Sequence, residues 1–393
     1  MVILLGDAAN VLKDFKDESI DCVVTSPPYW ALRDYKVEGS VWDADPNCEH
    51  DFSINHNLKK SNHNRSNHGT HEQWDLQPSR PNNPDFGESQ FCSKCNAWKG
   101  SFGLEPTFQL YIKHMLDIFD QIKRILKKEG TCWVVLGDTY AGTGNKGEWT
   151  DPKYDKGRNG QAVALNNKVE GIKDKSLCQI PQRFAIGMID RGWILRNDII
   201  WHKPNCMPSS ATDRFTVDYE HVFFFVKSQR YYFKTQYEPF TDIQVTETGA
   251  HSMYGVVRNR NLEYNTKYEY MEGNQKQLYK GTSKTIAPKN AEGRIKRTVW
   301  QITTRPYPDA HFAVFPEELI KTPIVAGCPE GGTVLDPFAG SGTTLLAAHK
   351  LLRNWIGIEI NKDYVALAKK RLTPYVQQQR LTSFQPPSIS TGT

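Results

Sequence analysis

The segment 333–344 reads TVLDPFAGSGTT, and it decides the fold that we predict for this 393-residue chain. It opens on an apolar run typical of a buried strand and continues into a glycine-rich turn. Residues 345–352 are rich in Leu and Ala and predict a helix. Glycines let a backbone approach a ligand closely, and a helix N-terminus favours a carboxylate or phosphate. The segment therefore predicts a strand, a ligand-binding turn and a helix of a doubly wound α/β fold.

The next predicted strand, residues 355–359, ends in the acidic Glu359. An acid at the end of the strand after such a turn suits the two hydroxyl groups of a ribose. A nucleotide-type cofactor is therefore the expected occupant of the turn.

The segment 25–30 reads TSPPYW and follows an apolar run, residues 20–24, that predicts a second buried strand. Its two prolines fix the backbone and stiffen the turn. The Ser26 hydroxyl and the Pro27 carbonyl can then accept hydrogen bonds at fixed positions, and Tyr29 offers a flat face beside them. This arrangement suits an exocyclic amino group on a planar ring. The alternative is a proline-stiffened strand end without chemistry.

Together the two motifs resemble those of DNA amino-methyltransferases that use S-adenosylmethionine. The order, with the catalytic turn first and the cofactor turn last, is similar to the permuted β group of that family. The resemblance implies a doubly wound, mostly parallel, Rossmann-like methyltransferase sheet. We expect an antiparallel hairpin, residues 220–226 and 231–233, to complete this sheet at its edge.

The resemblance also implies roles for individual residues. The catalytic turn would consist of Ser26, Pro27, Pro28 and Tyr29. The cofactor would be held by Asp7, Phe315, Asp336, Phe338, Gly340, Ser341, Gly342, Thr343 and Glu359. A turn similar to residues 201–205, WHKPN, lines the target-base pocket in the family, which would bring Lys203 and Asn205 close to DNA.

The implied reaction is site-specific transfer of a methyl group from S-adenosylmethionine to a base amino group in double-stranded DNA. The base would be flipped out of the stack. Turns that begin with Ser are commoner in cytosine-N4 enzymes of the family, so we favour cytosine N4 over adenine N6. One rival is an enzyme that methylates a protein or RNA amide, and another is a zinc-bearing DNA-binding protein with an inactive core.

A polar stretch, residues 36–103, is bracketed by Cys48-x-His50 and Cys92-x-x-Cys95. Two such pairs suit a tetrahedral structural zinc site, which can order a polar insert that has no core of its own. The alternative is a pair of unrelated buried cysteines with a surface histidine. We expect the zinc to serve folding or DNA binding, remote from methyl transfer.

The predicted organisation has six parts. They are the catalytic-motif part of the core (1–35), the zinc-knuckle insert (36–103), a further part of the core (104–234), a target-recognition region (235–297), the cofactor part of the core (298–373) and a flexible tail (374–393). Basic side chains alternate with tyrosines in the segment 235–297, as expected of a nucleic-acid surface. The long polar loop 142–176 is a candidate lid or DNA-contacting arm.

The net charge of +5 permits DNA binding without establishing it. The eight cysteines are scattered through a long chain, which argues against a disulfide framework. No run approaches the roughly 18 apolar residues of a membrane span. We expect a cytoplasmic protein of prokaryotic or phage origin, acting as monomer or homodimer without a membrane. Its expected partners are double-stranded DNA and, as a candidate, a cognate restriction endonuclease.

Overall fold

The computed structural model describes most of the chain. The described residues are 1–32, 37–53, 90–142, 169, 171–209, 211–239, 294–304 and 315–382, with the backbone alone at 269–272, 275–278 and 378–382.

Eight strands of the described residues form one sheet, in the order β1-β14-β13-β2-β5-β7-β6-β12. In that order the strands are Val2–Leu5, Asn354–Glu359, Thr333–Asp336, Ile20–Thr25, Leu126–Leu136, Tyr219–Val226, Ile194–His202 and Val299–Gln301. All neighbouring strands are parallel except β7, which is antiparallel to β5 and to β6. The predicted mostly parallel α/β sheet is therefore confirmed.

The predicted hairpin at the sheet edge is wrong. Residues 231–233 form no strand, and β7 lies inside the sheet between β5 and β6. Its apolar run 222–226 explains this position, because successive side chains of a strand point to opposite faces. Phe223 and Phe225 pack into one layer of the core, whereas Val222, Phe224 and Val226 pack into the other. A strand that is apolar on both faces belongs in the middle of a sheet.

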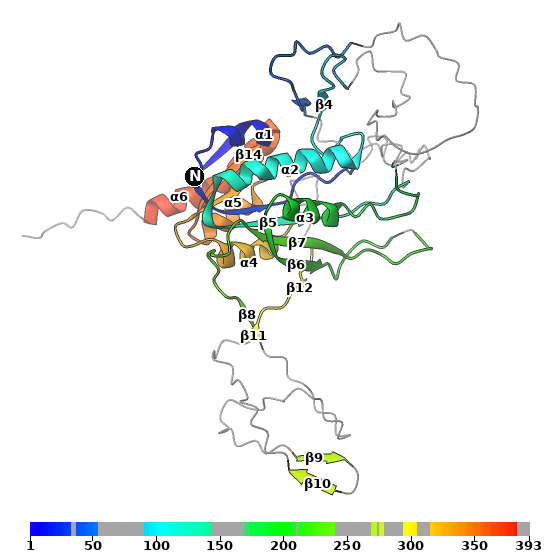
Figure 1. Ribbon diagram of the computed structural model, residues 1–393. Coiled ribbons are helices and arrows are strands. Elements are labelled where there is room, and N and C mark those ends of the chain that lie inside the picture. Colours follow the sequence, from blue (N-terminus) through cyan, green and yellow to red (C-terminus); the bar gives the residue numbers. More distant parts are fainter. Residues whose placement is uncertain are drawn as a thin grey trace, which may run out of the picture.

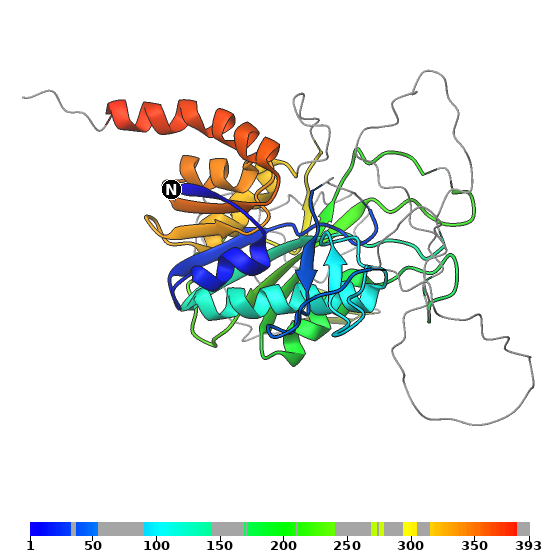
Figure 2. The same ribbon diagram turned by 90° about the horizontal axis from the view of Figure 1, so that it is seen from above.

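Helices cover both faces of the sheet (Figures 1 and 2). One face carries α1 (Ala8–Val11), α2 (Phe108–Ile125) and α3 (Ile180–Asp190), and a single 3-10 turn at Leu12–Asp14 follows α1. The other face carries α4 (Glu317–Gly327), α5 (Thr343–Lys350) and α6 (Lys362–Thr382). The core thus has two apolar layers, one on each side of the sheet.

Local contacts set the bounds of α2 and α6. Thr107 caps α2 by accepting a hydrogen bond from the Leu110 N–H, so the helix begins at Phe108. Helix α6 does not end before Pro374 but continues to Thr382. Val376, beyond the proline, packs against the core, and this contact stabilises the last turns of the helix.

The described ends of the polar insert form a small antiparallel hairpin of β3 (Ser40–Trp42) and β4 (Trp98–Gly100), which packs on α2 (Figure 1). Trp42 and Trp98 are 7% and 1% exposed and belong to the core of the sheet's α2 face. The ends of the insert are thus built into the main core.

The segment 235–297 leaves the sheet through β8 (Tyr237–Glu238) and returns through β11 (Arg294–Ile295), which pair with each other. Within it the backbones of β9 (Glu269–Glu272) and β10 (Gln275–Leu278) form a hairpin. Most of the predicted target-recognition region, the loop residues 143–168 and the tail residues 383–393 lie outside the described residues. No helix among the described residues combines the length and apolar character needed to span a membrane.

Candidate active site

Both sequence motifs open into one cavity of about 620 Å³. Its walls come from the residues that follow β1, β2, β13 and β14, together with the end of β6 and the start of β7. These positions share one edge of the sheet, because β7 runs antiparallel to the other strands. In open α/β sheets that edge is where ligands bind.

A buried hydrogen bond joins the two motifs. Thr25 Oγ1, at the end of β2, donates to Asp336 Oδ1, at the end of β13, at 2.6 Å. The same carboxylate oxygen accepts from the Phe338 N–H at 3.1 Å. Burial raises the pKa of the Asp336 carboxyl to about 6, although the Thr25 hydroxyl and the Phe338 N–H oppose that shift. Asp336 thus fixes the spacing of the two turns.

The glycine-rich turn curls around the Glu359 carboxylate. Glu359 Oε2 accepts from the Gly340 N–H and Oε1 from the Asn361 N–H, both at 2.8 Å. Burial raises the pKa of Glu359. Gly342 has φ +79°, and a Cβ there would lie 3.0 Å from Ala368 Cβ, so glycine suits this close approach. The turn leaves the N-terminus of α5 facing the cavity.

Another part of the cavity wall combines a carboxylate with aromatic rings. Asp7 caps α1 by accepting from the Ala9 N–H at 2.8 Å, and its second oxygen accepts from Ser40 Oγ at 2.7 Å. Phe338 stacks on Phe102 with ring centroids 5.6 Å apart. A flat aromatic ligand with hydroxyl groups fits such a surface.

The turn after β2 is held from several sides. The Pro28 carbonyl accepts from the Tyr111 hydroxyl at 2.7 Å. Tyr29 donates from its hydroxyl to Glu220 Oε2 at 2.7 Å, and Lys203 pairs with the other Glu220 oxygen. Gly137 leaves room for the tyrosine ring, because a Cβ there would lie 2.8 Å from Tyr29 Cε2. Among the described residues, the polar contact of Ser26 Oγ is a long one of 3.5 Å with the Tyr29 hydroxyl, which leaves Ser26 able to accept from a substrate.

The electrostatics of Tyr29 keep its hydroxyl protonated. Burial, reinforced by the negative charge of Glu220, raises the pKa of Tyr29 well above its ordinary value. A neutral ring that donates to a carboxylate has a fixed orientation, which suits stacking rather than proton abstraction.

The structure brings most of the predicted site residues together. The cavity is lined by Asp7, Ser26, Pro27, Pro28, Tyr29, Phe315, Phe338, Gly340, Ser341, Thr343 and Glu359. Asp336 and Gly342 are not among the lining residues and act on the shape of the turns instead. Lys203 and Asn205, expected near DNA, line the cavity as well. Residues 311–314, beside Phe315, lie outside the described residues.

The lining residues that the sequence analysis missed include Ser40, Phe102 and Glu220. Glu220 carried a signal, since it is an acid that opens an otherwise apolar strand. Phe102 and Ser40 lie at the ends of the polar insert. The sequence there has isolated aromatic residues but no periodic apolar pattern that would predict packing against the core.

The four predicted metal ligands cluster at the base of the β3–β4 hairpin. Their ligand atoms all lie within 4.8 Å of one another. Cys48 Sγ lies 3.9 Å from Cys92 Sγ, and Cys95 Sγ lies 3.3 Å from His50 Nδ1. Tetrahedral zinc at its usual bond lengths separates such atoms by about 3.5–3.8 Å, so the set fits the ion.

Backbone donors favour a thiolate in this cluster. The N–H groups of Asp51 and Lys94 both point at Cys92 Sγ, at 3.4 Å each. Hydrogen bonds of this kind stabilise a deprotonated sulfur, which is the form that binds a metal.

A family model described as DNA methylase matches residues 20–370, a span that contains both motifs. The chain therefore belongs to this DNA methylase family. The type II methyltransferase M.SmaI of Serratia marcescens is 32% identical over 373 residues, which cover 94% of this chain and 90% of that protein. M.Cfr9I of Citrobacter freundii is 31% identical over 368 residues, which cover 93% and 86% of the two chains. The protein is thus a DNA methyltransferase, and its cavity is the candidate active site of such an enzyme.

Proposed function

We propose that the enzyme transfers a methyl group from S-adenosylmethionine to an exocyclic amino group in double-stranded DNA, with cytosine N4 as the target. The observation that carries this proposal is the shared cavity. The glycine-rich turn with Glu359 and the Ser26–Tyr29 turn open into the same space. A methyl donor and an amine acceptor can therefore be aligned by groups that the fold already fixes.

The cofactor half of the cavity would bind S-adenosylmethionine, which supplies an electrophilic methyl group when bound. Glu359 faces the cavity and would accept from the ribose hydroxyls, while Phe338 and Phe102 would pack against the adenosyl portion. Phe315 would line the methionine end. The N-terminus of α5, beyond Gly340 and Ser341, would attract the carboxylate of the methionine.

The other half of the cavity would hold the target base. An exocyclic amine is a poor nucleophile because its lone pair is delocalised into the ring. Ser26 Oγ and the Pro27 carbonyl would accept from its two hydrogens and localise that lone pair on nitrogen. The nitrogen would form its new bond to the methyl carbon as the carbon–sulfur bond breaks and a neutral thioether leaves, and the nitrogen would then lose one proton to solvent. Tyr29, oriented by Glu220, would stack on the ring.

A base in a duplex cannot reach this cavity from within the stack, so the reaction requires base flipping. Trp201, Lys203 and Asn205 line the same end of the cavity and would contact the flipped nucleotide. The preference for cytosine rests on Ser26 at the head of the turn, and adenine N6 is the second candidate. The order of the motifs, with the catalytic turn first and the cofactor turn last, supports membership of the permuted β group as part of this proposal.

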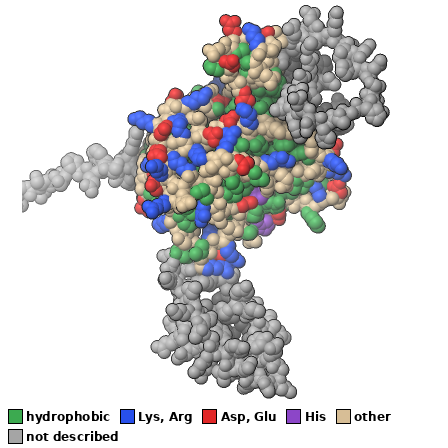
Figure 3. Space-filling model, viewed as in Figure 1, with side chains coloured by type: hydrophobic (Ala, Val, Ile, Leu, Met, Phe, Trp, Pro, Cys, Tyr) green, Lys and Arg blue, Asp and Glu red, His purple; other side chains and the backbone are tan. Residues whose placement is uncertain are grey.

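The recognition of sequence would come from the segment 235–297. On the face in Figure 3 the described Lys and Arg side chains are interspersed with Asp and Glu, without one continuous basic stripe. Basic and aromatic residues of the recognition segment are the candidates for reading DNA. The similar type II methyltransferases favour a cognate restriction endonuclease as a functional partner.

The Cys48, His50, Cys92 and Cys95 cluster would hold one structural zinc ion. Four protein ligands leave no open position for water, as expected of a structural rather than a catalytic site. Elemental analysis of protein purified without added metal should find about one zinc per chain, and C92S/C95S should abolish it.

A methyl-transfer assay with radiolabelled S-adenosylmethionine tests the substrate class. Duplex DNA should take up label, whereas RNA and protein should not. Label in protein or RNA alone would favour an amide methyltransferase, and zinc-dependent DNA binding without any transfer would favour an inactive core.

A further inference from the structure

The metal cluster lies at one end of the β3–β4 hairpin. Cys48 and His50 follow β3, and Cys92 and Cys95 precede β4. The two strands pair in register, with Ser40 opposite Gly100 and Trp42 opposite Trp98. A long stretch of sequence separates His50 from Cys92, so bringing the two arms of the hairpin together has an entropic cost. A metal bound by ligands from both arms would offset that cost and hold the hairpin closed.

The other end of the same hairpin lines the candidate active site. Val37, Ser40, Ser101 and Phe102 all contribute to the cavity wall. Ser40 Oγ donates to Asp7 Oδ2 at 2.7 Å, and the Trp42 ring packs on Phe102, with centroids 5.6 Å apart. Phe102 in turn stacks on Phe338. The hairpin therefore contacts two residues to which we assign cofactor binding, Asp7 and Phe338.

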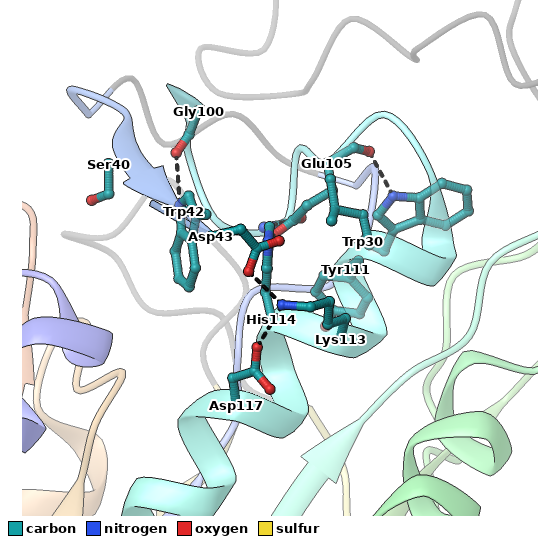
Figure 4. A network of polar contacts seen from close by, with 12 residues as sticks. Trp30, Ser40, Trp42, Asp43, Gly100, Glu105, Tyr111, Lys113, His114 and Asp117 are labelled. Atoms are coloured by element: carbon teal, nitrogen blue, oxygen red, sulfur yellow. Dashed lines mark hydrogen bonds and ion pairs between the residues drawn. The ribbon is translucent and has the colours of Figure 1, made fainter. Parts of the chain in front are cut away.

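A buried histidine ties the hairpin to helix α2 (Figure 4). The His114 ring stacks against Trp42 and Trp98, with centroids 4.6 Å and 5.6 Å apart. Its Nδ1 lies 3.0 Å from Glu105 Oε1, and its Nε2 lies 3.3 Å from Asp43 Oδ2. Both strands of the hairpin thus pack on one side chain, that of His114.

Glu105, which lies beside His114, also contacts the catalytic turn. The second Glu105 oxygen accepts from the Gly103 N–H at 2.8 Å. The Glu105 carbonyl accepts from Trp30 Nε1 at 2.9 Å (Figure 4). Trp30 directly follows Tyr29. The residue after this tryptophan is held as well, because the Gly103 carbonyl accepts from the Ala31 N–H at 2.8 Å. The hairpin, the cofactor wall and the catalytic turn therefore share one set of contacts.

We propose that the metal-closed hairpin is part of the cofactor-binding machinery, so that metal occupancy of the Cys48–His50–Cys92–Cys95 cluster sets the affinity for S-adenosylmethionine. This inference rests on the proposed cofactor and zinc sites. It replaces our expectation from the sequence that the metal is remote from methyl transfer, because the hairpin that the metal closes forms a wall of the cavity. By linkage, bound cofactor raises the metal affinity by the same factor.

The test measures binding rather than activity. Full-length enzyme is freed of zinc with a chelator, and zinc content is followed by elemental analysis. Calorimetry with S-adenosylhomocysteine should show affinity weakened roughly tenfold in the zinc-free protein and restored by one equivalent of zinc. A zinc-free protein that stays folded by circular dichroism and binds as tightly as the zinc form would overturn the proposal.

A second set of variants keeps the proposal testable if removal of zinc unfolds the chain. S40A removes the contact with Asp7, and F102L removes the stacking on Phe338, without touching the metal ligands. Both should retain zinc and bind S-adenosylhomocysteine several-fold more weakly. S53A is the matched control, because Ser53 is an exposed serine of the same arm that does not line the cavity. Unchanged affinity in both S40A and F102L would overturn the proposal.

Failure of the underlying assignments looks different. Zinc-loaded enzyme that does not bind S-adenosylhomocysteine at all would refute the cofactor site. Protein purified without zinc that nevertheless binds tightly would refute the role of the metal while leaving the cofactor site intact.

Discussion

Thr25 and Asp336 are 311 positions apart in the chain, and the Thr25 hydroxyl donates a 2.6 Å hydrogen bond to the Asp336 carboxylate. Both residues are fully or almost fully buried, at 0% and 1% exposed. Each ends a strand, β2 and β13, and each immediately precedes one of the two turns of the candidate active site. The contact therefore couples the predicted catalytic motif directly to the predicted cofactor motif.

The pH dependence of stability should carry the signature of Asp336. Its pKa is raised to about 6 in the folded protein, mainly by burial. The native state then binds more protons than the unfolded state between about pH 4 and pH 6, so this residue lowers the free energy of unfolding as pH rises through that window. D336N removes the titration. As pH rises across this window, the free energy of unfolding of the wild type should fall relative to that of D336N by up to about 3 kcal/mol. Urea unfolding of both proteins measures this difference. If the difference in free energy of unfolding between the two proteins did not change with pH, the raised pKa of Asp336 would be contradicted.

Ser26 should act on turnover rather than on cofactor binding. S26A removes one acceptor for the target amine while the turn keeps its prolines. We expect turnover to fall by about 10- to 1,000-fold, with S-adenosylhomocysteine affinity unchanged, because the lost interaction is strongest in the transition state. Single-turnover kinetics and calorimetry measure the two quantities. An S26A enzyme with normal turnover would remove Ser26 from the catalytic groups.

Tyr29 provides a pair of variants that separate its ring from its hydroxyl. Y29F loses the hydrogen bond to Glu220 but keeps a stacking surface, whereas Y29A loses both. Stacking of a base on an aromatic ring contributes about 1–3 kcal/mol. Y29A should therefore lose about 10- to 100-fold more kcat/KM than Y29F. Equal losses in the two variants would show that the hydroxyl, not the ring, is essential.

Glu359 should govern cofactor affinity. E359A should weaken S-adenosylhomocysteine binding by about 1.5–3 kcal/mol, as expected for the loss of hydrogen bonds to a charged group. The carboxylate also accepts from the Gly340 and Asn361 N–H groups, so E359A disturbs the turn as well. E359Q is the matched variant, since its amide oxygen can keep one of these acceptors. Calorimetry that finds wild-type affinity in both variants would reject the ribose assignment.

The local motifs made the centre of this fold predictable. A strand, a glycine-rich turn and a helix at residues 333–350 follow from short-range patterns, and the structure has them as β13 and α5. The strand before Ser26 followed from its apolar run in the same way. Such elements depend on neighbouring residues, which the sequence displays.

Long-range packing was the part that the sequence concealed. The apolar run of β7 indicated burial, but its place between β5 and β6 depends on partners far away in the chain. Strand β12 has only three residues, too few for a period to be seen. The polar insert concealed Trp42 and Trp98, whose partner His114 lies on a helix that is distant in sequence.

The identity of the methylated atom is the most direct test of the account. Duplex DNA is incubated with the enzyme and S-adenosylmethionine carrying a deuterated methyl group, and its nucleosides are then analysed by mass spectrometry. The account predicts deuterium-labelled N4-methylcytosine, formed much more slowly by S26A. Labelled N6-methyladenine alone would overturn the choice of base, and DNA that gains no labelled methyl group on an amino nitrogen would contradict the proposed reaction itself.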